Sequence, residues 1–373
     1  MVKKNFSLLS VLNLLVISAL VLTACSKTNP TAAPVQATQA LSPALQTSAL
    51  LTAPRASAPA ANTYTIDSVV KGQIVFHAWV GGRSQIFIEK ADGSDVRQLV
   101  KSDFDDLSPA LSPDGRKVVF TRWTPEPTGT YVVNVDGTDL HQLNAAGCVK
   151  PCVNLEVEGH PWSPDGTQIV YDRAVADASG QCCVEFGWWV MNADGSGAHP
   201  VWYVTPATED HNVDWSPDGK RFVFMRRDNT MSPVHTAIFT RATDGSDVQQ
   251  LTSWELDAND PAWSPDGRLI AFCTICDYGV GDLNIYSIHP NGTGLTQLTS
   301  NLNADGSGSM ATFHPSWSPN GKQIVFSHYP STNGTSDLFV MNRDGSDLHV
   351  LALTDIFEAN ADWGISPKPK LKY

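Results

Sequence analysis

Pro261-Ala262-Trp263-Ser264-Pro265-Asp266-Gly267 is one copy of a pattern that recurs along this chain about every 50 residues. Ser-Pro-Asp-Gly or Ser-Pro-Asn-Gly forms its centre, and a Trp usually precedes the Ser directly. Leu111 takes the place of the Trp in the first copy, and Trp363 lies two residues further back in the last. The motif begins at Ser112, Ser163, Ser216, Ser264 and Ser318, with a degenerate copy at Ser366, and the preceding residues are Trp162, Trp215, Trp263 and Trp317.

A second turn motif alternates with the first. It consists of Asp-Gly or Asn-Gly followed by Ser or Thr. Between the two motifs lie short runs of β-forming residues, such as Val118-Val119-Phe120 and Ile324-Val325-Phe326. Pro presets the backbone of a type I turn and Gly supplies the positive φ that follows, so each motif joins two antiparallel strands. The second motif begins at Asp92, Asp136, Asp194, Asp244, Asn291 and Asp344.

Each repeat therefore contains four short antiparallel strands, and the repeats number six. We predict an all-β fold, a six-bladed β-propeller over residues 64–367, with the repeated Trp packed between neighbouring blades. The first repeat begins at Gln73 with its second strand, whereas the chain ends with an unpartnered inner strand, Asn360 to Trp363. Pairing these two segments would complete the first blade and cover both exposed edges.

The N-terminus has the features of a bacterial export signal. Lys3 and Lys4 precede an apolar run that ends in Leu22-Thr23-Ala24-Cys25. We predict a signal peptide over residues 1–24, with Cys25 as the first mature residue and the site of lipidation. Residues 25–63 are rich in Ala, Pro, Thr and Ser and read as a low-complexity tether, and residues 368–373 as a tail. The protein is thus expected to be exported and lipid-anchored to a bacterial membrane, at the outer membrane and periplasm or at the cell surface.

Composition excludes one large class of function. The 373 residues contain 25 Lys and Arg against 38 Asp and Glu, for a formal net charge of −13. A general nucleic-acid binder needs clustered Lys and Arg to neutralise phosphates, so no nucleic-acid partner is predicted.

The repeats resemble the WD40-like (PD40-type) repeats of the TolB family of bacterial envelope proteins. The resemblance is carried by Pro-x-Trp-Ser-Pro-Asp-Gly, as in 261–267 and 315–321, and by the Asp-Gly-Ser turn followed by Gln-Leu-Thr. It implies the propeller fold and an envelope role. TolB itself has an α/β domain before its propeller, whereas this sequence has a low-complexity stretch there, so we expect a TolB-like propeller lipoprotein.

Variable loops mark one face of the predicted propeller. The loops from the second to the third strand and from the fourth to the next inner strand share that face, and they carry all the variation in length. The inner strands begin near it and line the central channel, where polar residues recur one and three places before the Trp position. These residues could bind a polar peptide or a cation, or they could simply line a water-filled channel. The candidate partner-binding residues are His160, His211, Asn212, Asp214, Asp260, His314, Asn360 and Asp362.

Six cysteines besides Cys25 are candidates for disulfides, because export exposes a protein to oxidising conditions. Topology favours bridges that join Cys148 and Cys152 to Cys182 and Cys183, since both pairs fall in long loops of one blade. Cys273 and Cys276 could bridge locally.

The sequence favours a non-catalytic, membrane-tethered scaffold that binds another envelope protein or peptide through the long-loop face. No catalytic residues, metal ligands or cofactor are assigned, and the oligomeric state is left open. Two alternatives stay open: a metal-assisted polysaccharide lyase or hydrolase, which would need several convergent ligands, and a carbohydrate-binding module.

Overall fold

The computed structural model describes residues 72–124, 128–143, 152–175, 185–205, 207–274, 284–300, 311–329, 336–352 and 357–367. The chain divides into two units, Met1–Val69 and Val70–Tyr373, and all described residues belong to the second. The predicted signal peptide, Cys25, the tether and the tail lie outside the described residues. In the part of the chain that is described, no helix is long and apolar enough to cross a membrane.

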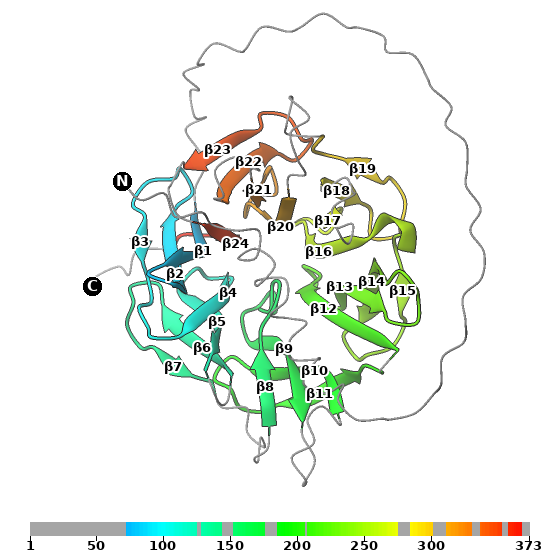
Figure 1. Ribbon diagram of the computed structural model, residues 1–373, viewed down its shortest axis with the longest axis horizontal. Coiled ribbons are helices and arrows are strands. Elements are labelled where there is room, and N and C mark those ends of the chain that lie inside the picture. Colours follow the sequence, from blue (N-terminus) through cyan, green and yellow to red (C-terminus); the bar gives the residue numbers. More distant parts are fainter. Residues whose placement is uncertain are drawn as a thin grey trace, which may run out of the picture. The chain divides into compact units, whose positions relative to one another are not determined.

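Six antiparallel sheets of four strands stand around a central axis (Figure 1), so the predicted six-bladed β-propeller is confirmed. A short 3-10 helix, η1 (Trp254–Leu256), is the one helical element among the described residues. Blades are numbered here along the chain, and their strands run from the axis outward.

Blade 1 contains β24 (Glu358–Gly364), β1 (Gln73–Val80), β2 (Arg83–Lys90) and β3 (Arg97–Gln98); blade 2 contains β4 (Asp105–Leu111), β5 (Lys117–Trp123), β6 (Gly129–Asn134) and β7 (His141–Gln142); blade 3 contains β8 (Cys152–Glu156), β9 (Gln168–Val175), β10 (Glu185–Asn192) and β11 (His199–Tyr203). Blade 4 contains β12 (Thr208–Trp215), β13 (Arg221–Asp228), β14 (His235–Ala242) and β15 (Gln249–Gln250); blade 5 contains β16 (Ala258–Trp263), β17 (Ile270–Thr274), β18 (Ile285–Ile288) and β19 (Thr296–Gln297); blade 6 contains β20 (Ala311–Trp317), β21 (Gln323–Tyr329), β22 (Asp337–Asn342) and β23 (His349–Ala352).

The Ser-Pro-Asp-Gly turns are fixed by their own first side chain. Ser112 Oγ donates a hydrogen bond to Asp114 Oδ1 at 2.7 Å and accepts one from the Lys117 amide at 3.0 Å. Gly115 has a φ of 69°, a left-handed conformation that Gly adopts without steric cost. The same two serine bonds recur in the later copies, at Ser163, Ser216, Ser264 and Ser318.

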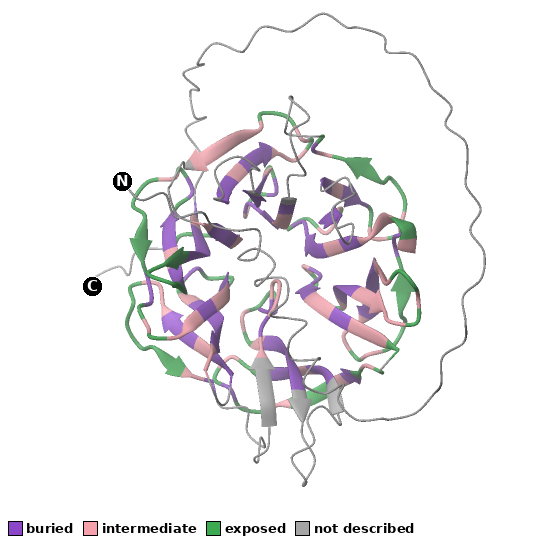
Figure 2. Ribbon diagram, in the orientation of Figure 1, coloured by how far each residue is buried: buried purple, intermediate pink, exposed green. Residues whose placement is uncertain are grey.

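Apolar side chains fill the spaces between adjacent blades. Buried residues, purple in Figure 2, occur in strands of every blade. Trp162 of blade 3, only 7% exposed, packs with Val119 and Val132 of blade 2 and with Ile169 of its own blade. Trp215 of blade 4 lies in the same way against Val170 of blade 3. The predicted packing of these Trp residues between blades is therefore confirmed.

Hydrogen bonds join each inner strand to the next in two alternative ways. Where the residue before the Trp position is Ala or Pro, its carbonyl accepts the indole N–H of the next blade, as Ala110 does from Trp162 at 3.2 Å. Where that residue is Asp or Ser, its side chain instead accepts the next blade's main-chain N–H. The first kind joins Ala110 to Trp162, Pro161 to Trp215 and Ala262 to Trp317; the second joins Asp214 to Trp263, Ser316 to Trp363 and Asp362 to Leu111.

The last strand closes the ring. β24 pairs antiparallel with β1, with Ile74 opposite Trp363, so the predicted pairing of the C-terminal inner strand with the first blade is confirmed. The Asp362 carboxylate also accepts the Leu111 amide of blade 2 at 2.7 Å. The pairing of β24 with β1 thus joins the last repeat to the first.

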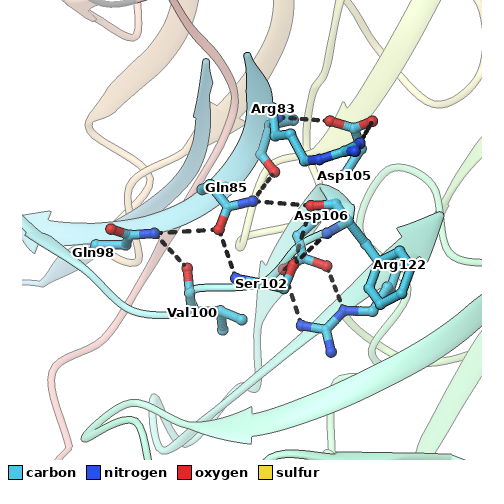
Figure 3. A network of polar contacts seen from close by, with 10 residues as sticks. Arg83, Gln85, Gln98, Val100, Ser102, Asp105, Asp106 and Arg122 are labelled. Atoms are coloured by element: carbon cyan, nitrogen blue, oxygen red, sulfur yellow. Dashed lines mark hydrogen bonds and ion pairs between the residues drawn. The ribbon is translucent and has the colours of Figure 1, made fainter. Parts of the chain in front are cut away.

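A polar network links β2 of blade 1 to β4 and β5 of blade 2 (Figure 3). Gln85 of β2 donates to the Phe104 carbonyl at 2.9 Å and accepts the Ser102 amide at 2.9 Å. Ser102 Oγ then donates to Asp106, which forms a two-pronged ion pair with Arg122 at 2.7 and 3.0 Å. Asp106 is fully buried, so Arg122 is needed to compensate its charge.

We expect deletion of residues 358–373 to lower the melting temperature by roughly 10 °C or more. The deletion removes buried Trp363, whose loss alone is worth about 3–5 kcal/mol, and exposes the edge of β1. Deletion of residues 368–373 alone is the matched control and should leave melting unchanged. Equal melting of the two truncated proteins, measured by calorimetry, would show that ring closure does not depend on β24.

Candidate functional site

Each inner strand turns its backbone at one equivalent position. The residue three places before the Trp position has a positive φ in all six blades, and five of the six inner strands change register with their neighbour there. Asn and Asp tolerate this left-handed conformation better than most residues, although Ser and His also adopt it here. The six residues, with φ between 49° and 70°, are Ser108, Gly159, Asn212, Asp260, His314 and Asn360.

The turned residues converge on one pocket at the centre of the ring. Its volume is about 370 Å³, including space open to solvent. Six of the eight sequence-predicted residues line it, whereas Asp214 and His211 do not. The pocket lining includes all six residues three places before the Trp position, but of the residues one place before it only Asp362. The predicted role of these residues in binding a partner stays a prediction. The lining consists of Ser108, Pro109, Gly159, His160, Asn212, Asp260, Pro261, His314, Pro315, Asn360, Ala361 and Asp362.

His160 connects blade 3 to a side chain of blade 1 in this pocket. Its Nδ1 lies 3.0 Å from Asp362 Oδ1 of blade 1, although His160 belongs to blade 3. Asp362 Oδ1 also accepts a hydrogen bond from Ser316 Oγ of blade 6 at 3.0 Å. Asp362 therefore links side chains from three blades.

The charges around His160 favour its protonated form. Burial lowers the pKa of His160, but the hydrogen bond to Asp362 and the charges of Asp214 and Asp362 outweigh burial and raise it to about 9. Burial tends to raise the pKa of Asp362, but His160 holds it below its ordinary value. Burial raises the pKa of Asp214 to about 7, because the opposing effects of His160 and the Trp263 amide are smaller. At neutral pH the pocket thus holds an imidazolium–carboxylate pair beside a second, partly protonated acid.

Asp260 is the centre of a second group of hydrogen bonds in the pocket wall. Its Oδ1 accepts a hydrogen bond from Asn212 Nδ2 at 2.5 Å, and its Oδ2 accepts the His314 amide at 3.3 Å. The His314 ring lies 3.5 Å from the same oxygen, and its Nδ1 has no hydrogen-bond partner among the described residues. On the neighbouring wall, Asn360 donates to Ser108 Oγ at 3.3 Å. The pocket wall therefore offers both donors and acceptors to a polar ligand.

Cys273 lies behind Asp260 and corrects one prediction. Its thiol is free and fully buried, and it donates a hydrogen bond to Asp260 Oδ2 at 3.4 Å. The predicted local bridge to Cys276 is not formed, because this side chain points into the interior toward Asp260. Burial raises the pKa of the Cys273 thiol well above its ordinary value, and the Asp260 charge adds to the effect. Cys148, Cys182, Cys183 and Cys276, and the side chain of Cys152, lie outside the described part of the chain, so the other predicted bridges remain predictions.

His211 lies beside the pocket within a cluster of acids that the sequence reasoning missed. Its Nδ1 is 3.2 Å from Glu158 Oε2, and its Nε2 is 3.7 Å from Glu209 Oε2. Burial raises the pKa of Asp172 to about 8, and the nearby Glu158 charge adds to it. Asp172 directly follows the triplet Ile169-Val170-Tyr171, and its acidic side chain is unusual there. The residues at this place in the other blades are His77, Thr121, Met225, Cys273 and Ser327. An Asp in blade 3 alone is the feature of the sequence that could have indicated the acidic cluster.

The arrangement can bind polar and charged groups, but it contains no assembled metal centre. Among the described residues, no group of three or more His, Cys, Asp or Glu side chains is arranged to hold a metal ion. Its acids and imidazoles are instead paired with one another or with the main chain of the next blade.

Comparison with known proteins assigns the family. The profile of the TolB β-propeller domain (PD40) matches residues 68–279, more than half of the chain. The chain belongs to the TolB β-propeller family. The Tol-Pal system protein TolB of Francisella tularensis is 23% identical over 248 residues, which are 66% of this chain and 52% of that protein. This propeller thus spans about half the length of the TolB proteins it matches.

Two further relatives extend the comparison. An uncharacterized protein of Agrobacterium fabrum is 28% identical to this TolB-family chain and is covered over 74% of its length, with 61% of the chain aligned. The crystal structure of TolB from Acinetobacter baumannii superposes with a TM-score of 0.59 at 19% identity, covering 79% of this chain and 66% of that one. This structural likeness agrees with the propeller fold.

The His160–Asp362 pair predicts a specific dependence of stability on pH. His160 has a folded-state pKa of about 9 against about 6.5 in an unfolded chain, so its contribution is complete below pH 6.5 and is lost as pH rises through 9. Wild type should therefore exceed His160→Gln in stability by roughly 3 kcal/mol near pH 6, and this difference should shrink toward pH 10. Denaturant unfolding of both proteins at several pH values measures it, and a difference that stays constant would refute a charged His160.

Proposed function

We propose that this protein is an exported, membrane-tethered and non-catalytic propeller that binds another envelope protein or peptide at the mouth of its central channel. One observation carries the proposal: all six inner strands turn at the same position and direct their residues to one axial pocket. A pocket with Asp, Asn, His and Ser side chains can bind a polypeptide segment through its side chains and main chain.

The charge of the site favours a basic or polar segment. Asp260, Asp362 and Asp214 lie in or beside the pocket, and Glu158 adds a fourth acid next to it. The pKa of Glu158 is lowered, because the charge and hydrogen bond of His211 outweigh its burial. Acid-rich surroundings attract cationic groups and repel anionic ones, so electrostatics would guide a basic segment to this face.

The location and the anchor rest on other features. The curated relatives carry the name Tol-Pal system protein TolB, which supports an envelope setting. The tether and lipid anchor rest on the Leu22-Thr23-Ala24-Cys25 sequence. Such an anchor would hold the propeller at a membrane.

Crosslinking in cells followed by capture from membranes tests the proposal. The pocket variant is His314→Gly with Asn360→Gly, since these side chains line the pocket but, among the described residues, make no hydrogen bond to the main chain of a neighbouring blade, and Gly keeps the left-handed turn. We expect a protein captured by wild type to be reduced at least tenfold with this variant. Asp214 and Asp362 are unsuitable for the purpose because they also bind the main chain of the next blade.

Lys220→Ala is the matched control, because its exposed side chain lies in a Ser-Pro turn on the opposite face. It should capture the partner as wild type does, and Cys25→Ala should leave the membrane fraction. Equal capture by all folded variants would mean that the partner binds elsewhere. Absence of any captured protein would reject the scaffold.

A further inference from the structure

Three residues of blade 3, Glu158-Gly159-His160, leave their own sheet and enter the centre of the ring. β8 pairs with β9 as far as Glu156 opposite Asp172, and pairing resumes only where the Val170 amide donates to the Pro161 carbonyl. Between these points the chain pairs instead with blade 4. The His160 amide donates to the Val213 carbonyl at 3.1 Å, and His160 forms a parallel bridge with Asp214. We call Glu158–His160 the plug.

Gly159 allows this departure. Its φ is 70°, and a Cβ at this position would lie 2.8 Å from the Val213 carbonyl oxygen. The plug backbone therefore lies directly against β12, closer than any other residue type would permit.

The His160 ring extends from there into the channel, where it is part of the pocket lining. One ring nitrogen lies 3.0 Å from Asp362 Oδ1 of blade 1, and Pro315 of blade 6 lines the same pocket. Blade 2 separates blade 3 from blade 1 in the ring, so the imidazole reaches past blade 2 to make this pair. The plug is thus held by contacts to blades 1 and 4.

Every charged group that faces the plug is identifiable. Asp362 of β24 and Asp214 of β12 approach the ring, while Asp260 of β16 and His314 of β20 line the same pocket. Glu158, within the plug, pairs with His211 of β12, and its charge also acts on Glu156 of β8 and Asp172 of β9, whose pKa values it raises further. Because the plug presents a cation to carboxylates, a group that replaces it must be another cation that can donate hydrogen bonds to oxygen.

We propose that the plug closes the channel from within, and that an ammonium or guanidinium group of a partner enters by displacing the His160 imidazolium from Asp362. This inference builds on the proposed function for its natural partner. Its test uses small probes, so it does not depend on finding that partner.

His160→Gly removes the plug side chain and should leave a cavity lined by Asp362, Asp214 and the Pro315 carbonyl. We expect methylguanidinium, measured by calorimetric titration of the purified full chain at pH 7, to bind this variant at least tenfold more tightly than wild type. 4-Methylimidazole, which replaces the missing ring, should compete with methylguanidinium for the variant. His199→Gly is the matched control, because it removes an exposed imidazole of β11 that is not part of the pocket lining, and it should bind as wild type does.

Equal binding of methylguanidinium to wild type and His160→Gly would overturn the proposal, as would equal gains in His160→Gly and His199→Gly. Should His160→Gly fail to fold, wild type is titrated at pH 7 and at pH 10, where the imidazolium has lost its proton and methylguanidinium has not. Affinity should then rise at least tenfold with pH, and His160→Gln should show a clearly smaller rise, because, of the carboxylates that act on His160, only Asp214 gains charge over this range. A flat wild-type response would overturn the proposal, whereas loss of partner capture alone would affect only the proposed function.

Discussion

One backbone constraint organises the whole centre of this propeller: the left-handed residue three places before the Trp position of every inner strand. A strand that kept its regular pleat would alternate its side chains between the two neighbouring blades. The turn interrupts that alternation and directs residues toward the axis, which is why all six line one pocket. Folding thus tolerates a less favoured backbone conformation at the place where a ligand can be bound.

The ring is held together next to these turns, so stability and binding share side chains. Asp214 and Asp362 each accept a main-chain N–H from the next blade and also supply charge to His160. Their substitution would disturb the joint between blades as well as the pocket. Within the described part of the chain, the His314 and Asn360 side chains make no such main-chain bonds. Their replacement by Gly, which adopts the left-handed turn without strain, therefore changes the pocket without breaking a joint between blades.

The fold was largely readable from sequence, because turn chemistry and strand patterns repeat in every blade. Counting from Trp263 and its equivalents gave the ring closure and placed Asp260 and His314 on the channel wall. The path of His160 could not be read in this way, because it depends on the plug leaving its sheet, which only Gly159 hints at. The Asp172 cluster and the free thiol of Cys273 were also missed, since both depend on which way a buried side chain faces across two blades.

The charge state of His160 tests this account most directly, because the proposed closure of the channel depends on an imidazolium paired with Asp362. Nitrogen-15 NMR of the histidine side chains, assigned with His160→Gln, measures its titration in the intact protein. We predict an imidazole protonated on both nitrogens at pH 7 that titrates near pH 9. Titration at or below its ordinary value of 6.5 would contradict the pair with Asp362 and the closed channel built on it.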